Sequence, residues 1–286
     1  MKNQHTNNLL LLALATLFIS TSGALGKFID LPTPVIIWCR AAFGALFLFL
    51  FCKFKKYDLK IRSKKDLPTI IIGALLLGAH WLTYFYALKL SNVALGMLSM
   101  FTFPVMTALL EPLFTKSKPN PIHIILALIV LLGIYILAPE INFENTYLKG
   151  ILFGLFSALC YSLRNLILKR HVNSYNGTVL MMQQTLIISI ILLPVMFLMD
   201  TSNIKTQFPY IITLALVTTA IGHSLFISSL KHFSVSTASI IGSAQPIFGI
   251  IIAFIFLNEV PTLNTFIGGF LILATVVIES VRSRKG

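Results

Sequence analysis

The sequence contains an internal repeat with an offset of 142 residues, about half of its length. The offset aligns Lys27 with Lys169, Pro104 with Pro246, and residues 87–89 (Ala-Leu-Lys) with 229–231 (Ser-Leu-Lys). Each half reads as five apolar stretches. Because five is odd, the second half would have to enter a membrane from the side opposite to the first. Inverted repeats of this kind are typical of transporters, in which the substrate site lies between two like halves.

Composition excludes a soluble domain with a polar surface. Hydrophobic residues make up 57% of the chain, charged residues make up 11%, and the mean hydropathy is +0.89. Ten apolar stretches are long enough, or nearly so, to cross a bilayer: 9–27, 34–52, 68–88, 93–115, 122–138, 149–168, 177–199, 208–230, 235–257 and 264–281. The sequence therefore predicts an all-α integral membrane protein whose ten transmembrane helices form two inverted five-helix repeats, 1–145 and 146–286, around a central cavity.

The distribution of charge predicts the orientation in the membrane. Basic residues gather in alternate connections, above all in 53–66, and near both ends of the chain. The other connections hold only Lys27, Lys89, Lys149 and Lys205. The positive-inside rule then predicts a multi-pass protein of the cytoplasmic membrane with both termini cytoplasmic. The net charge of +13 is explained by the lipid bilayer as partner rather than by nucleic acid.

The sequence gives only weak support for a secretory signal peptide and none for a cysteine-based site. The stretch 9–19 after Lys2 has the character of a secretory h-region, but the match between the first and sixth stretches favours a retained membrane helix. The three cysteines, Cys39, Cys52 and Cys160, have no spacing that predicts a disulfide framework or a metal site. We expect no cofactor and no metal.

Three prolines, Pro104, Pro194 and Pro246, lie within apolar stretches and predict kinked helices. Pro104 and Pro246 are repeat partners, and a proline inside a helix removes a backbone hydrogen bond. In a membrane the freed carbonyl must be satisfied by a neighbour or a cavity. A matched pair of interrupted helices is therefore the best sequence indication of hinges or gates beside a transport site.

Several of these features together resemble the EamA-type repeat of the drug/metabolite transporter superfamily. They are a small residue before Leu-Lys, a proline about sixteen positions later, and Leu-Asn-Glu259 after the second proline; Arg40 matches a position where the family often has arginine. The resemblance covers essentially the whole chain. It implies alternating-access transport of small metabolites, often export, with the fifth and tenth helices at the periphery. Those two stretches have few polar groups near the midplane, so we expect them to face lipid or a second subunit of a homodimer.

Polar groups in the bilayer core cost about 2.5–3.5 kcal/mol each on insertion scales, so those within the apolar stretches are candidate site residues. Arg40 and Arg164 could bind a carboxylate or phosphate. Each also lies close enough to a membrane interface to extend its guanidinium out of the core, and that alternative stays open.

An aromatic and polar face is expected on the third stretch. His80, Trp81 and Tyr84 have the spacing of one helix face, and His223 is the repeat partner of Trp81. This twofold placement favours a cavity, although a histidine that ties helices together is the alternative. Further candidate binding residues are Tyr161, Gln184 and Gln245, which stands beside Pro246.

No acidic residue is found near the midplane of any stretch, whereas arginine and histidine are. Exporters of lipophilic cations generally need such a carboxylate. The sequence therefore predicts a secondary transporter, an exporter, of a polar, anionic, zwitterionic or aromatic metabolite resembling an amino acid. Proton coupling through a histidine and facilitated diffusion both remain open. A membrane enzyme is disfavoured because no aspartate cluster or His/Asp pair is present, and we expect no catalytic residues. A membrane assembly or sensor subunit is the other alternative.

Overall fold

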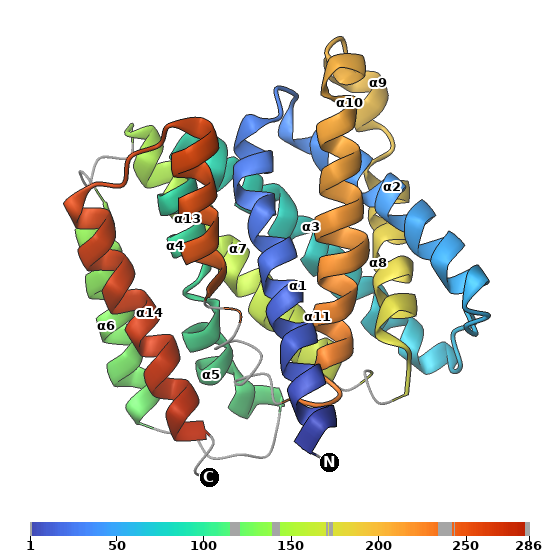
Figure 1. Cartoon of the computed structure of the whole chain (residues 1–286), viewed down its shortest axis with the longest axis horizontal. Helices are drawn as coiled ribbons and strands as arrows, with labels where there is room; N and C mark the ends of the chain where they lie inside the picture. The colour runs from blue at the N-terminus through green and yellow to red at the C-terminus, as the bar shows by residue number, and fades with distance from the viewer. Residues whose placement is uncertain are drawn as a thin grey trace.

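The computed structural model describes residues 2–114, 121–138, 144–169, 171, 174–233, 242 and 244–283, and all regular elements within those ranges are helices (Figure 1). The first half contains α1 (Lys2–Phe28), α2 (Thr33–Phe54), η1 (Lys64–Asp66), α3 (Leu67–Leu90), α4 (Val93–Met100), α5 (Phe103–Phe114) and α6 (Ile122–Leu137). The second half contains α7 (Thr146–Lys169), α8 (Gly177–Leu192), α9 (Val195–Leu198), α10 (Ile204–Thr213), η2 (Leu214–His223), α11 (Ser224–Ser229), α13 (Ala244–Leu257) and α14 (Leu263–Ser283).

Seven helical runs in the described part of the chain are long and apolar enough to cross a membrane. They are 7–28, 33–54, 64–90, 93–114, 146–169, 177–198 and 204–229. Three shorter apolar helices, 122–137, 244–257 and 263–278, coincide with the fifth, ninth and tenth predicted stretches. The prediction of a helical membrane protein is therefore confirmed, while the count of ten crossings stays a prediction.

The predicted break at Pro104 is present. α4 ends at Met100 and α5 begins at Phe103, so the chain leaves the helix at residues 101 and 102, and Pro104 is the second residue of α5. Pro246 is the third residue of α13, and the stretch 234–241 before that helix lies outside the described residues. At Pro194, where the sequence also predicts a kink, an interruption separates α8 from α9.

The helices pack against one another in pairs. α3 lies along α7, α2 along α8, and α1 against α13 and η2. Small residues allow the closest approaches: Gly150 lies against Ser91, and Gly154 against Ser99. α6 and α14 pack on each other at one edge of the bundle (Figure 1), where the fifth and tenth stretches were expected. The site is therefore built by the other helices.

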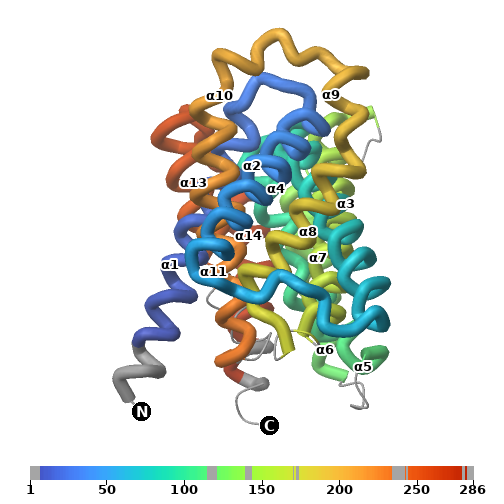
Figure 2. The backbone as a smooth tube through the Cα atoms, turned by 90° about the vertical axis from the view of Figure 1, so that its right-hand side faces the viewer, coloured from blue at the N-terminus to red at the C-terminus, as the bar shows by residue number. Residues whose placement is uncertain are grey.

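The two ends of the bundle are closed by different connections. At the Asp66 end, the Tyr175 hydroxyl donates to Asp66 Oδ2 at 2.7 Å and accepts from the Arg62 N–H at 2.9 Å. Burial, followed by this bond to Asp66, raises the pKa of Tyr175, so its hydroxyl remains a donor at neutral pH. At the opposite end, the Lys89 end, the α9–α10 connection passes over the α1–α2 connection (Figure 2), and Asn203 donates to Asp30 at 3.3 Å.

Residues 142 positions apart make similar contacts at these opposite ends. The Lys27 ammonium donates to the Ser91 carbonyl at 2.7 Å and to the Lys89 carbonyl at 3.3 Å. The Lys169 ammonium donates to the Leu230 carbonyl at 2.7 Å and to the Phe233 carbonyl at 3.3 Å. In each half, a lysine at the end of the first long helix thus binds free carbonyls where a neighbouring helix ends.

Candidate functional site

The centre of the candidate site is Arg40, on the face of α2 that packs inside the bundle. Its side chain is only 1% exposed. Its Nε donates to Thr219 Oγ1 at 2.7 Å, and its guanidinium carbon lies 4.1 Å from the centre of the Trp81 ring. Nη1 and Nη2 have no hydrogen-bond partner. Arg40 therefore does not reach a membrane interface, and its two-pronged end is free to bind a ligand.

The local structure of η2 places the partners of Arg40. η2 is a π-helix, a rare form that occurs frequently at functional sites, and it contains both Thr219 and His223. Gly44 on α2 makes room for this contact, because a Cβ there would lie 2.9 Å from Thr219 Cγ2. The wide turn of η2 and the glycine together let Thr219 reach Arg40.

Aromatic rings from α3 and α7 form the wall opposite. The His80 ring is stacked on Tyr84 at 6.0 Å between centroids and lies 4.5 Å from Tyr161. The Ser157 hydroxyl donates to the His80 carbonyl at 3.0 Å and lies 2.7 Å from His80 Nδ1. Because a hydroxyl has one proton, this pattern assigns the ring proton to Nδ1 and leaves Nε2 as the acceptor in the neutral ring.

Trp81 and His223, the predicted repeat partners, meet edge to face at 5.7 Å. Trp81 Nε1 and His223 Nδ1 are buried and have no hydrogen-bond partner. Buried polar groups without a partner cost free energy, so a ligand that accepts or donates a hydrogen bond at these nitrogens would be stabilised.

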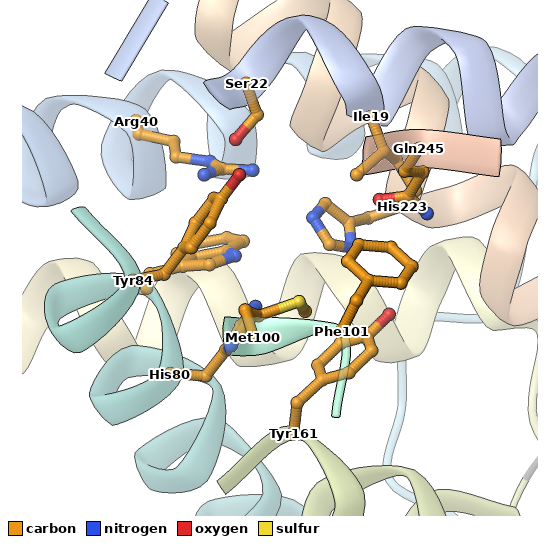
Figure 3. A pocket seen from close by; sticks show the side chains of 11 residues that line it. Ile19, Ser22, Arg40, His80, Tyr84, Met100, Phe101, Tyr161, His223 and Gln245 are labelled. Carbon is orange, nitrogen blue, oxygen red and sulfur yellow. The ribbon is translucent and has the colours of Figure 1, made fainter. Parts of the chain in front are cut away.

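These side chains enclose one pocket (Figure 3). Its lining consists of Ile19, Ser22, Arg40, His80, Trp81, Tyr84, Met100, Phe101, Tyr161, His223 and Gln245. The cavity between them has a volume of about 20 Å³, room for about one water molecule, so a larger ligand requires the lining side chains to move apart. In Figure 3 the hydroxyls of Ser22 and Tyr84 point towards the Arg40 guanidinium. None of the described lining residues is acidic.

A second polar cluster, the Arg164 cluster, lies beside this pocket and consists of Arg164, Asn165 and Gln184. Arg164 is 0% exposed, so it too fails to reach an interface. Its Nη2 donates to Gln184 Oε1 at 2.7 Å and its Nη1 to Asn165 Oδ1 at 3.2 Å. Arg164 Nε, Asn165 Nδ2 and Gln184 Nε2 have no partner.

Arg40 and Arg164 carry positive charge into the bundle without an acidic partner. Among the described residues no aspartate or glutamate is buried. The cost of burying an ion in a protein is several kcal/mol even after relaxation. The site as described can therefore bind an anionic group, and two such charges are available.

Seven of the nine predicted binding residues line the pocket, and two lie outside it. The structure brings Arg40, His80, Trp81, Tyr84, Tyr161, His223 and Gln245 into the pocket, whereas Arg164 and Gln184 belong to the neighbouring cluster. Sequence reasoning missed Ser22, Thr219, Met100 and Phe101. Thr219 precedes His223 by four residues, the spacing of one helix face, and Ser22 is the repeat partner of Arg164, so each had a usable signal.

Metal chemistry has no candidate in the described part of the chain. No three His, Cys, Asp or Glu side chains there lie close enough to hold an ion. The three cysteines are free and buried.

Comparisons with known proteins agree over most of the chain. Residues 7–138 and 148–281 match the model of the EamA-like transporter family. The threonine/homoserine exporter RhtA of Escherichia coli (strain K12) is 26% identical over 259 residues, which cover 89% of this chain and 84% of the exporter. The uncharacterized transporter YwfM of Bacillus subtilis (strain 168) is 21% identical over 221 residues, 76% of this chain and 75% of that protein.

The fold has a counterpart among solved structures. A crystal structure of another protein aligns with a TM-score of 0.72 over 98% of this chain and 98% of the other, at 18% identity. At that identity the likeness shows the fold alone.

Proposed function

Because the chain belongs to the EamA-like transporter family, we propose that this membrane transporter exports a small amino-acid-like metabolite bearing a carboxylate. The substrate is anionic or zwitterionic and binds in the Arg40 pocket. Its passage follows alternating access, in which the two halves rock around the pocket.

The observation that carries this proposal is the free end of Arg40. Nη1 and Nη2 are buried, face a pocket and have no partner, while Nε is held by Thr219. A planar guanidinium held at one nitrogen presents its other two in the geometry that matches a carboxylate. An anion there would also neutralise a charge that has no acidic partner among the described residues.

The other lining residues have groups that can contact the remainder of an amino acid once the pocket widens. The faces of Tyr84, Tyr161 and Trp81 can contact an ammonium group or an apolar side chain. Acceptors for an ammonium or hydroxyl are available on Ser22 and Gln245. One relative is named a threonine/homoserine exporter, which supports a zwitterionic substrate and the direction of export.

The topology we propose has ten crossings in two inverted halves, 1–145 and 146–286, with both termini cytoplasmic. The equivalent contacts of Lys27 and Lys169 at opposite ends support the inversion. The basic connection 53–66 lies at the Asp66 end, which the positive-inside rule makes cytoplasmic. The Lys89 end then faces outwards.

Two sets of contacts would open and close the pathway. At the outer end, Glu259 Oε2 accepts the Val93 N–H at 2.8 Å and so joins the second half to the start of α4. At the cytoplasmic end, Tyr175 joins the second half to Asp66 of the first. Pro104 and Pro246, each in the first turn of its helix, would act as the hinges at which α5 and α13 bend between these contacts.

The test is transport by the purified protein in proteoliposomes. We expect L-threonine or L-homoserine loaded on one side to drive counterflow of the labelled compound, and an analogue without the carboxylate to be inactive. Ligand binding should also raise the melting temperature, because a ligand stabilises the state that binds it. Stabilisation and transport of tetraphenylphosphonium, with no response to any amino acid, would overturn the proposal.

A further inference from the structure

Resting on the carrier function above, we propose that the Arg164 cluster is a second anion subsite. It receives the substrate carboxylate on the cytoplasmic side of Tyr161, and two side-chain amides close it in this structure. Arg40 and Arg164 would then hold the same group in succession.

The Arg164 cluster lies where a second binding position for the substrate would be expected along the transport pathway. Arg164 follows Tyr161 by three residues on α7, which places it about 4.5 Å further towards the cytoplasmic end. The Arg164 guanidinium carbon lies 6.0 Å from the Tyr161 ring, which also neighbours the rings of His80 and Phe103 in the first half and of Phe226 in the second. Tyr161 lines the pocket and contacts the cluster, so its side chain stands between them.

The hydrogen bonds of the cluster show how it is closed. Both terminal nitrogens of Arg164 are occupied by amide oxygens, one from Gln184 and one from Asn165. These neutral acceptors leave the positive charge unbalanced. A carboxylate is the stronger partner, because charge-assisted hydrogen bonds are roughly twice as strong as neutral ones. It would replace the two amide oxygens.

The Arg164 cluster also contains hydrogen-bond donors that have no acceptor. Arg164 Nε, Asn165 Nδ2 and Gln184 Nε2 are all buried without a partner. Gly73 on α3 leaves room for the Gln184 amide, since a Cβ there would lie 2.8 Å from Nε2. A group that only fixed the packing of α7 against α8 would not need three unused donors around one charge.

The experiment places a permanent carboxylate on Arg164 through the substitution Gln184→Glu. The matched control is Gln183→Glu, the same change one residue earlier, where the native amide donates to the Leu59 carbonyl at 3.2 Å and does not contact Arg164. Half-saturation for L-threonine is measured in membrane vesicles of both orientations. Arg164→Gln is the second variant, and melting temperatures report whether each variant is folded.

We expect the substitutions to change the half-saturation concentration only on the cytoplasmic side of the membrane. Gln184→Glu and Arg164→Gln should raise the cytoplasmic half-saturation concentration by about tenfold or more, the worth of one charge-assisted hydrogen bond. The outer value should stay within about twofold, and Gln183→Glu should resemble the wild type on both sides. Equal changes on both sides, or none, would overturn the subsite alone. Absence of amino-acid transport by the wild type would overturn the carrier proposal and the subsite with it.

Discussion

Arg40 and Arg164 are both buried arginines without an acidic partner, yet their hydrogen bonds are opposite. Arg40 uses Nε and leaves both terminal nitrogens free, whereas Arg164 uses both terminal nitrogens and leaves Nε free. The first presents a carboxylate-binding fork to a pocket, and the second has its fork covered. If the two arginines bind the substrate in succession, as we propose, this structure corresponds to the state in which Arg40 can accept a carboxylate and Arg164 is covered by amides.

The largest effect is expected from Arg40→Met. Loss of two charge-assisted hydrogen bonds, each about 1.5–3 kcal/mol, should raise the half-saturation concentration for substrate at least about 100-fold. The same variant should have a higher melting temperature without substrate, because an apolar side chain of similar length replaces an unpaired buried charge. Transport assays and thermal unfolding of the purified protein test both statements.

The melting temperature of Arg164→Met is to be compared with that of Arg40→Met. Loss of the Arg164 guanidinium also leaves the oxygens of Gln184 and Asn165 without their donor, so the gain in melting temperature should be smaller than that of Arg40→Met. Normal transport by Arg40→Met would show that Arg40 does not bind the carboxylate. An equal gain in both variants would show that the two arginines are equivalent.

The next effect concerns how Arg40 is held. Thr219→Val removes the bond to Nε but keeps a β-branched side chain, so we expect roughly a tenfold loss of apparent affinity with the maximal rate little changed. Thr219→Ser should restore affinity. Thr218→Val is the matched control, because Thr218 bonds only the Leu214 carbonyl of its own helix. If all three variants behave alike, Thr219 has only a packing role.

This pair of threonines also shows how far the sequence predicts the site. Apolar stretches and the repeat predict the helices and the pairing of Trp81 with His223, because both depend on periodicity that is written along the chain. The sequence does not reveal that Thr219 rather than Thr218 meets Arg40, since that choice depends on the π-helical turn of η2. Nor does it reveal that Arg164 points to Gln184 instead of the pocket, because tertiary packing decides the direction of a long side chain.

A smaller effect is expected at the cytoplasmic closure. Tyr175→Phe removes the bond to Asp66, worth about 1 kcal/mol, so the state open to the cytoplasm should become about fivefold more populated. We expect the cytoplasmic half-saturation concentration to fall and the outer one to rise. Tyr57→Phe is the control, because Tyr57 lies between α2 and η1 at the same end of the bundle but packs its ring against Phe51. A change in the reverse direction would assign the Asp66 contact to the other state.

The smallest effects should come from the two glycines that leave room for the partners of each arginine. A methyl group at Gly44 would lie 2.9 Å from Thr219 Cγ2, and one at Gly73 would lie 2.8 Å from Gln184 Nε2. Thr219 is stiff because it is β-branched, whereas the end of Gln184 can turn away. Gly44→Ala should therefore raise the half-saturation concentration for substrate on the outer side about two- to threefold. That factor corresponds to a cost of less than about 1 kcal/mol for moving Thr219.

Gly73→Ala should act only on the cytoplasmic side, because it moves the amide that covers Arg164 and leaves the Arg40 pocket intact. Gly78→Ala is the control, because Gly78 also lies on α3 against α8 and its nearest neighbour, Ile188 Cγ1, would lie at an ordinary 3.4 Å. Side-specific half-saturation measurements again separate the variants. If Gly44→Ala and Gly73→Ala changed the same side, the two arginines would have to serve one station, because each glycine reports on the partner of only one of them.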